Sequence, residues 1–466
     1  MNNYSVSSSL LEWCHRLLSC PSVTHENTYH IMKMCAEDLL RPNGLEPRLL
    51  PSATEGASQT NLICVVRGQE HDRPPIILNT HLDTVPPGDP ASWTECSEGP
   101  FVPILKDGRI YGLGAADTKL DFVAKAMALI ERGIPRRDVF LVATYGEEHG
   151  LVGAKELAGA GILPRDGLAF VGEPSHLQVI TAHKGLMVFQ LEIEFSPDPQ
   201  RHESLPIYRL LFQGQSAHSS TPALGRNAIR LALDFMSRRP ELQVVSIEGG
   251  DAVNKVPARC VLAIGAAAPP ALDNLARLEV GQARAAKFVP GQVFSLLSSF
   301  LAMLAEFSDR AGAPELDYAP PTLTFNPGVI RSNDNSISLE FELRPPPSLP
   351  LEHIRKGVAQ ITEELDGSYR DLKIKLAERR ANPGFRSSAA SETVELAMRA
   401  LAGADLPLET AVKTGCTEAG VYAQIGIAPV VFGPGPSTGV IHAPNEYNLV
   451  TEVESAVRFY LELLHL

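Results

Sequence analysis

The sequence predicts an α/β fold in which a mostly parallel sheet domain is interrupted by an inserted α+β domain. Over the first 185 residues, short apolar runs alternate with amphipathic helical patterns, which is typical of a parallel sheet. From about Leu186 the strand patterns alternate apolar and polar residues, and past Pro347 the first style returns. A chain of 466 residues is also long for a single core. We expect three segments, 1–185, 186–349 and 350–466, of which the first and third form one domain.

Apolar runs and helix signals define the elements of the first segment. Helical spacing indicates helices over 10–19 and 29–40, and a third that begins at Asp117, a candidate N-cap residue. The stretch 88–108 is rich in proline, glycine and polar residues, so we expect a loop there. Buried strands are predicted at 62–66, 76–79, 139–144 and 168–171.

Apolar runs and helix signals also define the elements of the second and third segments. In the second we expect strands at 186–195, 208–212, 244–247, 260–264, 323–325 and 336–343, and helices at 227–236, 272–288 and 293–307. In the third we expect helices at 353–365, 389–401 and 453–464, and strands at 372–376 and 428–432. The densest apolar stretch, 293–307, is judged too short and too polar to span a bilayer.

Composition excludes several classes of protein. The net charge of -13 and the lack of any lysine or arginine cluster argue against nucleic-acid binding. Seven scattered cysteines, with no CxxC pair, favour neither a disulfide framework nor a thiolate zinc site. Residues 1–10 lack a cationic start followed by an apolar core, so we expect no signal peptide and a cytoplasmic protein.

A histidine and a carboxylate follow the predicted strand at 76–79. Residues i and i+2 of an extended chain point the same way, so His81 and Asp83 can emerge together. A metal-bound histidine usually donates its second ring proton to a carboxylate. This HxD motif alone is weak, because a solvated loop pair would look the same.

Further candidate ligands follow other predicted strands or open a helix. They are Asp117, Glu147, Glu148, Glu173 and His442. Each has an ordinary explanation alone, such as helix capping for Asp117 or a turn at Glu173. Ligands in open parallel sheets bind beyond the carboxyl ends of the strands, so these side chains should converge. Together they form a nitrogen and oxygen donor set that suits zinc, cobalt or manganese. One carboxylate bridging two ions would make a two-metal hydrolytic site, with one of the adjacent glutamates left as general base.

Eight motifs spread from Asn79 to Tyr447 carry a family resemblance. In order they are HLDTVP, GLGAADTK, YGEE, GEPS, AHKG, GQSAHSSTPALGRNAI, GGDAVNKVP and HAPNEY. This series closely resembles the dinuclear zinc deacylase and peptidase family, which includes acetylornithine deacetylase, succinyl-diaminopimelate desuccinylase, aminoacylase and glutamate carboxypeptidase. The GEPS, AHKG, GQSAHSS, GGDAVN and CTEA motifs are most similar to acetylornithine deacetylase.

The resemblance implies a zinc-peptidase type catalytic domain with two divalent ions, Zn²⁺ or alternatively Co²⁺. It implies that Asp117 bridges the ions, with His81 and Glu173 on one ion and Glu148 and His442 on the other. Glu147 resembles the general base, and Asp83 resembles the partner of His81.

The resemblance also implies a lid, formed by the inserted domain, that serves as the surface of a homodimer. His218 resembles the lid histidine that reaches a neighbouring active site and stabilises an oxyanion. Asn254 and Arg344 resemble residues that hold a substrate carboxylate, although an exposed strand arginine is the alternative for Arg344. Thr417 lies in a turn that resembles a substrate-lining loop, whose Cys416 could equally be a buried small hydrophobe.

Two features depart from the family pattern. Leu120 and Asp121 stand where the family often has a glycine-rich run, and we expect them to narrow the pocket floor. Polar insertions at about 196–204 and 266–320 enlarge the lid.

The sequence therefore favours a cytoplasmic metal-dependent amidohydrolase that removes an acyl group from an N-acyl amino acid, with acetylornithine-like substrates preferred. A dipeptidase or carboxypeptidase on the same scaffold is the alternative. A catalytically silent binding protein is a third reading, but all the expected ligands and the base are present. A serine nucleophile at 219–220 lacks a nucleophile-elbow motif. We expect a small acyl amino acid or short peptide as partner, and neither nucleic acid nor membrane.

Overall fold

A computed structural model describes residues 8–196, 204–271, 276–285 and 287–466. The chain forms two compact units, the first made of Met1–His183 with Asn382–Leu466 and the second of Lys184–Ala381. The mixed α/β class and the interrupted domain are as expected. The second break, however, lies at 381/382 and not at 349/350.

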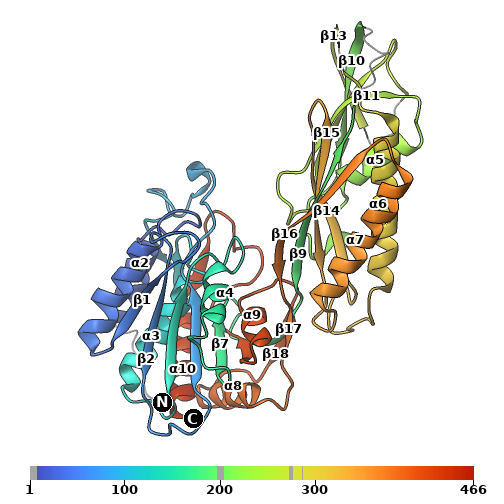
Figure 1. The fold of residues 1–466 in the computed structure, drawn as a ribbon. Coiled ribbons are helices and arrows are strands. Elements are labelled where there is room, and N and C mark those ends of the chain that lie inside the picture. The colour runs from blue at the N-terminus through green and yellow to red at the C-terminus, as the bar shows by residue number, and fades with distance from the viewer. Residues whose placement is uncertain (1–7, 197–203, 272–275, 286) are drawn as a thin grey trace. The chain divides into compact units, whose positions relative to one another are not determined.

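The first unit is built on one mixed sheet with strand order β1-β2-β6-β3-β7-β19-β8-β17, and β18 pairs with β8 (Figure 1). Its centre is parallel, because β3 pairs in parallel with both β6 and β7, and β19 with β7. The strands are β1 (Pro47–Pro51), β2 (Thr60–Val66), β3 (Ile76–His81), β6 (Val139–Thr144), β7 (Leu168–Gly172), β8 (Val179–His183), β17 (Phe385–Arg386), β18 (Thr410–Lys413) and β19 (Ala428–Val431).

Helices cover both faces of this sheet. Successive strand residues point to opposite faces, and the two buried clusters follow that alternation. Ile76 and Leu78 join the cluster that contains side chains of α1, α2, α3, α8 and α10, whereas Ile77 joins the cluster with α4 and α9. The helices are α1 (Ser8–Leu18), α2 (Tyr29–Met34), α3 (Lys119–Arg132), α4 (Val152–Gly159), α8 (Glu392–Gly403), α9 (Ala419–Gln424) and α10 (Val450–His465).

Two local details differ from the sequence predictions. The expected helix over 29–40 continues beyond α2 as a π-helical segment, Cys35–Leu40. The expected loop 88–108 contains a short strand, β4 (Ile104–Lys106), which pairs with β5 (Arg109–Tyr111). β5 in turn pairs with β20 (Tyr447–Leu449), so a small sheet joins the chain near Asp117 to the chain near His442.

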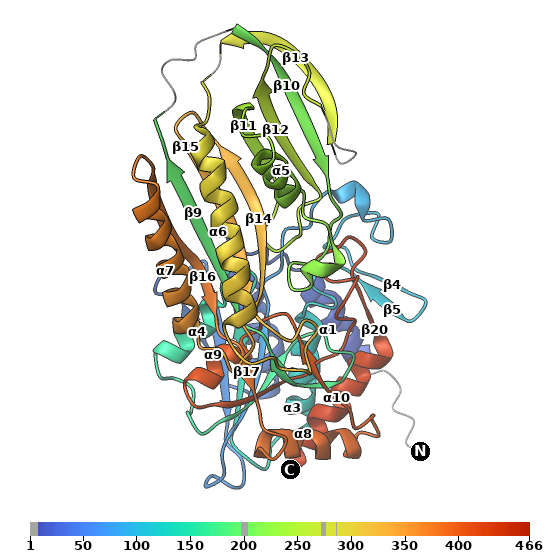
Figure 2. The same ribbon diagram turned by 90° about the vertical axis from the view of Figure 1, so that its right-hand side faces the viewer.

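The second unit is an antiparallel sheet with one helical layer, which is the expected α+β arrangement (Figure 2). Its strand order is β13-β10-β12-β11-β14-β15-β9-β16. The strands are β9 (Leu186–Glu194), β10 (Ser204–Gln213), β11 (Gln243–Gly249), β12 (Arg259–Gly265), β13 (Ala276–Ala285), β14 (Thr324–Ser332), β15 (Ser336–Arg344) and β16 (Lys373–Asn382). The helices α5 (Ala228–Ser237), α6 (Gly291–Arg310) and α7 (Leu351–Ser368) share its core.

The helix expected over 272–288 is wrong. Ala276–Ala285 forms β13, which pairs antiparallel with β10. The stretch is rich in alanine, arginine and leucine, which favour helices, but pairing with a neighbouring strand overrides that propensity. The insertion at 196–204 lies almost wholly outside the described residues, which resume at 204.

The expected domain boundary at 349/350 fails because α7 and β16 belong to the second unit. Ile354, Val358 and Leu365 of α7 lie in the same buried cluster as the side chains of β9 and β15. β16 lies next to β9 and is the edge strand of that sheet. Helix-then-strand order alone cannot show which of two sheets a strand joins.

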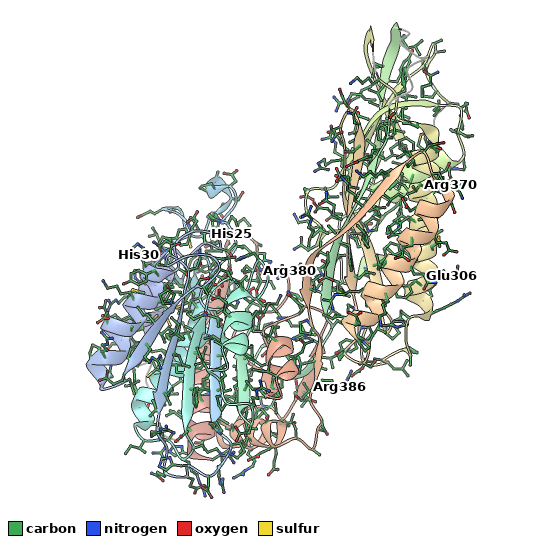
Figure 3. The ribbon with its side chains drawn as sticks, in the orientation of Figure 1. His25, His30, Glu306, Arg370, Arg380 and Arg386 are labelled. Atoms are coloured by element: carbon green, nitrogen blue, oxygen red, sulfur yellow. The ribbon has the colours of Figure 1, made fainter. Side chains whose placement is uncertain are left out.

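Helix α6 is longer than the predicted helix 293–307. The expectation that this segment is too short and too polar to span a bilayer is therefore wrong. By length and composition alone, its 20 residues could cross a membrane. Val293, Leu297 and Phe300 are fully or almost fully buried in the core of the second unit, while Glu306 lies on the exposed side (Figure 3). A core helix passes the same test, and the burial of α6 fits that role.

Candidate metal centre

The parallel centre of the first sheet brings the predicted ligands together. His81 ends β3, and Thr80 of β3 lies opposite Gly172 of β7, so Glu173 emerges beside it. On the other side His81 lies opposite Thr144, the last residue of β6. The turn after β6 carries Glu147 and Glu148. These strand ends therefore deliver one histidine and three carboxylates to one edge of the sheet.

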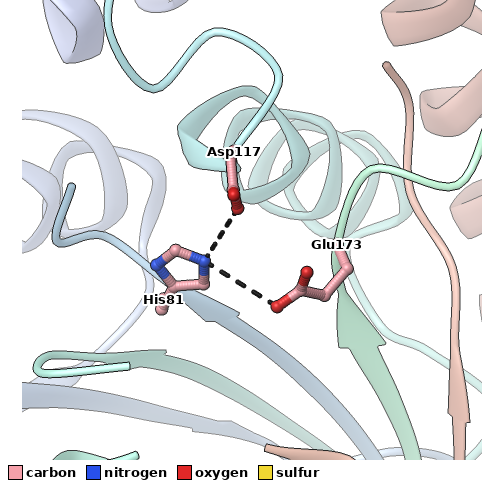
Figure 4. Close-up of side chains that lie close together, drawn as sticks. All are labelled: His81, Asp117 and Glu173. Carbon is pink, nitrogen blue, oxygen red and sulfur yellow. Dashed lines mark hydrogen bonds and ion pairs between the residues drawn. The ribbon is translucent and has the colours of Figure 1, made fainter. Parts of the chain in front are cut away.

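The first ligand group contains His81, Asp117 and Glu173 (Figure 4). His81 Nε2 lies 3.1 Å from Asp117 Oδ1 and 3.9 Å from Glu173 Oε1. All three side chains are buried, and their ligand atoms lie within 4.8 Å of one another. Buried charges persist only when paired or when they bind a metal, so this cluster is chemically suited to a cation.

The second ligand group contains Asp117, Glu148 and His442. His442 Nε2 lies 3.3 Å from Asp117 Oδ2 and 3.2 Å from Glu148 Oε1. Asp117 thus presents one carboxylate oxygen to each histidine. Burial opposes the ionisation of Asp117, but hydrogen bonds from His442 and His81 outweigh that effect and lower its pKa. An ionised carboxylate between two donor groups has the form required to bridge two ions.

Asp83 organises the site through the backbone. His81 Nδ1 lies 3.1 Å from the Asp83 carbonyl oxygen and 3.5 Å from its carboxylate. A carbonyl only accepts, so Nδ1 carries a proton, and Nε2 is the ring nitrogen left to bind an ion once its own proton is released. The Asp83 carboxylate also accepts the Glu147 N–H at 3.1 Å and the Glu148 N–H at 3.3 Å. Asp83 therefore lies beside His81, as expected, and also fixes the glutamate turn.

Glu147 lies at the same edge of the sheet and is 8% exposed. Burial raises its pKa well above the ordinary value, and the negative charge of Glu173 adds to that effect. A carboxylate with a raised pKa accepts a proton more readily near neutral pH. The environment of Glu147 thus suits a proton acceptor.

Two residues near the ligands were not identified from the sequence. Lys413 Nζ lies 3.0 Å from Glu173 Oε2. Glu446 Oε1 accepts the N–H of Ala116 at 2.8 Å and that of Asp117 at 3.0 Å. The HAPNEY motif contained Glu446, but its role depends on contacts with a segment more than 300 residues away, which no local spacing reveals.

The expectation that Leu120 and Asp121 narrow the pocket floor is not supported. Leu120 is 0% and Asp121 is 1% exposed. Asp121 Oδ2 accepts Thr80 Oγ1 at 2.7 Å and pairs with Lys125 Nζ at 2.7 Å, and its Oδ1 accepts the Tyr460 hydroxyl at 2.6 Å. This network lies inside the core, next to the strand residue that precedes His81.

The predicted lid residues all belong to the second unit. His218 and Asn254 are both exposed. Their chain segments lie side by side, because the Ser219 N–H donates to the Asn254 carbonyl at 3.1 Å. Arg344 is 4% exposed, and its Nε donates to Glu342 Oε1 at 2.6 Å. It is therefore not the exposed strand arginine of the alternative reading.

Thr417 is fully buried in the first unit. Its hydroxyl lies 2.9 Å from His183 Nε2, and its N–H donates to the same nitrogen at 3.1 Å. The neighbouring Cys416 is half-buried. The contacts of Thr417 fix the turn, whereas the prediction gave it a place on the substrate-lining surface.

Comparison with known proteins decides the family. The family model described as peptidase family M20/M25/M40 matches residues 77–466, which includes every candidate metal ligand. The chain belongs to peptidase family M20/M25/M40. It is thus a member of a hydrolase family, and it carries two candidate metal-ligand groups that share Asp117.

Individual relatives in the M20 family are named for different activities. An acetylornithine deacetylase of Klebsiella pneumoniae (strain 342) is 34% identical over 209 residues, which is 40% of this chain and 48% of that protein. The match thus spans about half the length of that relative. Among solved structures, an aminoacylhistidine dipeptidase from Vibrio alginolyticus has a TM-score of 0.66 at 16% identity, covering 99% of this chain and 98% of that one. An M20 metallo-carboxypeptidase from Sulfolobus solfataricus has a TM-score of 0.62 at 16% identity, covering 98% of both chains. These structures share the fold.

Proposed function

We propose that this M20 protein is a dinuclear metal-dependent deacylase that hydrolyses the amide bond of an N-acyl amino acid. The observation that carries the proposal is the geometry of Asp117. Its two oxygens lie 3.1 Å and 3.3 Å from the Nε2 atoms of His81 and His442. Each histidine is joined by one further carboxylate, Glu173 or Glu148. This donor set of imidazole and carboxylate groups suits Zn²⁺, with Co²⁺ as a chemically similar alternative.

Glu147 is the proposed proton carrier. Ions held by the two ligand groups would supply an activated water and a polarised acyl carbonyl. Glu147, buried beside both groups, would take the proton from the attacking water and return it to the leaving amine. The Asp83 carboxylate fixes the backbone of Glu147 for that task, at 3.1 Å from its N–H.

The lid residues are assigned by role. We propose that His218 stabilises the oxyanion and that Asn254 holds the substrate carboxylate, because both are exposed on neighbouring segments of the second unit. Arg344 was expected to share the second task. Its ion pair with Glu342 favours a supporting role instead.

Three further properties are proposed. The 34% identity to an acetylornithine deacetylase supports acetylornithine-like substrates over dipeptides. The resemblance of the lid supports a homodimer through the second unit. All seven cysteines, each within the described residues, are free of disulfides, which fits a reducing compartment such as the cytoplasm.

The test is amine release from a panel of N-acetyl, N-succinyl and other N-acyl amino acids and from dipeptides, with Zn²⁺- or Co²⁺-loaded protein. Glu147→Gln is the inactive variant, and Glu98→Gln, an exposed carboxylate in the first unit, is the matched control. We expect turnover of acyl amino acids by the wild type and Glu98→Gln, and a loss of at least about 10²-fold in Glu147→Gln with its metal content unchanged.

Turnover of dipeptides alone would move the protein to the peptidases and leave the metal centre intact. An active Glu147→Gln variant would refute the assignment of the base. No turnover of any compound by the metal-loaded wild type would refute the proposed deacylase.

A further inference from the structure

Lys413 is a positive charge set inside the cluster of carboxylates. It ends β18, which pairs in parallel with β8 so that Lys413 lies opposite His183. Its side chain is 19% exposed, and its Nζ lies 3.0 Å from Glu173 Oε2. The negative charges of Asp117 and Glu147 also act on the Lys413 ammonium group.

The two oxygens of Glu173 have different partners. Oε1 lies 3.9 Å from His81 Nε2, on the side of the first ligand group. Oε2 lies 3.0 Å from Lys413 Nζ. A carboxylate held in this way offers one oxygen to an ion and keeps the other on the ammonium group. A catalytic ion needs such an open coordination position for its substrate.

Lys413 also changes the charge of the first ligand group. Asp117 and Glu173 together contribute two negative charges, and the ammonium group cancels one of them. A divalent cation at this group is attracted by the carboxylates and repelled by Lys413 at close range. The repulsion is large because the carboxylates and the ammonium group are mostly buried, where screening by water and salt is weak.

We propose that Lys413 is a positioning residue that limits Glu173 to one coordinating oxygen and lowers the divalent-cation affinity of the His81–Asp117–Glu173 group. The inference rests on the metal centre of the proposed function but concerns a residue outside the predicted ligand set. Removal of the ammonium group should release Glu173 Oε2 and remove the repulsion, so both effects act in the same direction. The ion should bind more tightly, and turnover should fall because the second oxygen competes with substrate.

The experiment measures Co²⁺ binding to metal-free protein by isothermal titration calorimetry at one pH, with the visible absorption of bound Co²⁺ as a second readout. Lys413→Met removes the charge and Lys413→Arg keeps it. Lys106→Met, which removes an exposed lysine paired with Glu95 in the same unit, is the matched control. The same measurements in a Glu148→Ala background assign the change to the first group. Far-UV circular dichroism checks folding, and Lys413→Gln replaces Lys413→Met if the latter does not fold.

We expect Lys413→Met to bind Co²⁺ about tenfold more tightly than the wild type or more, with a lower kcat. Lys413→Arg and Lys106→Met should bind as the wild type does. Unchanged or weaker Co²⁺ binding in Lys413→Met would refute the proposed role of Lys413 and leave the proposed metal centre standing. A wild-type protein that binds no Co²⁺ would refute the metal centre and the proposed function with it, so the two failures are distinguishable.

Discussion

Substitution of the buried Lys125 by methionine should destabilise the first unit strongly. Lys125 is 0% exposed, and its Nζ pairs with Asp121 Oδ2 at 2.7 Å. It also donates to the carbonyls of Asn79 at 2.5 Å and Phe170 at 3.1 Å and to Thr80 Oγ1 at 3.0 Å. Asn79 and Thr80 lie on β3, which ends with His81, and Phe170 lies on β7, which Glu173 directly follows. Lys125 therefore joins the backbones of the two strands behind the first ligand group.

The expected cost follows from what the substitution leaves behind. Methionine fills a similar volume but leaves the Asp121 charge in the core with the hydroxyl groups of Thr80 and Tyr460 as its side-chain partners in the described part of the chain. Removing one member of a buried ion pair costs about 3–5 kcal/mol. Asp121→Asn in the same background removes the stranded charge and keeps an oxygen for the hydroxyl groups. The double variant should therefore lose about 1–3 kcal/mol less than the sum of the single variants.

The assay is urea denaturation of the metal-free protein, followed by far-UV circular dichroism, for the wild type, both single variants and the double variant. Lys106→Met, whose lysine is exposed, serves as the control and should show little change. A loss below about 1 kcal/mol in Lys125→Met, or additive effects in the double variant, would refute the inference that the pair acts as one buried unit.

Two further predictions concern residues behind the ligands. Burial raises the pKa of Glu418 from 4.5 to about 7, so its contribution to stability is present below pH 4.5 and is lost as the pH rises to about 7. The glutamine of Glu418→Gln stays neutral, so urea denaturation should show this variant becoming more stable than the metal-free wild type as the pH rises through that window, by up to about 3 kcal/mol at pH 7.5. A stability difference that does not change with pH would contradict this. Glu446→Ala removes the acceptor for the Ala116 and Asp117 N–H groups and should weaken the binding of both ions by about 10–100-fold in a Co²⁺ titration, because Asp117 is shared. Glu446→Gln retains an acceptor oxygen and should bind nearly as the wild type does, and loss of only one ion in Glu446→Ala would argue against the bridge.

The convergence of the ligands could be predicted because it follows from local rules. The apolar run before His81 indicates a strand, and parallel neighbours bring their carboxyl ends to one edge. That reasoning anticipated the neighbourhood of His81, Glu147 and Glu173. His442 was also expected there, but local spacing does not show how its loop reaches the site, which depends on the pairing of β20 with the distant β5.

Other features could not be predicted because they depend on tertiary partners. Lys413 has no motif of its own, and only the pairing of β18 with β8 brings it to Glu173. Asp121 was expected at the pocket floor. Helix spacing alone cannot show that it instead forms a buried ion pair with Lys125, one turn later in the same helix. The strand Ala276–Ala285 has a helix-like composition, and pairing with β10 determines its conformation.

The bridge formed by Asp117 is the central claim, and anomalous diffraction from crystals of the Zn²⁺-loaded protein tests it most directly. The claim predicts two zinc peaks, one beside His81 and Glu173 and the other beside Glu148 and His442, with one oxygen of Asp117 on each. A single peak, or two peaks that do not share Asp117, would contradict it.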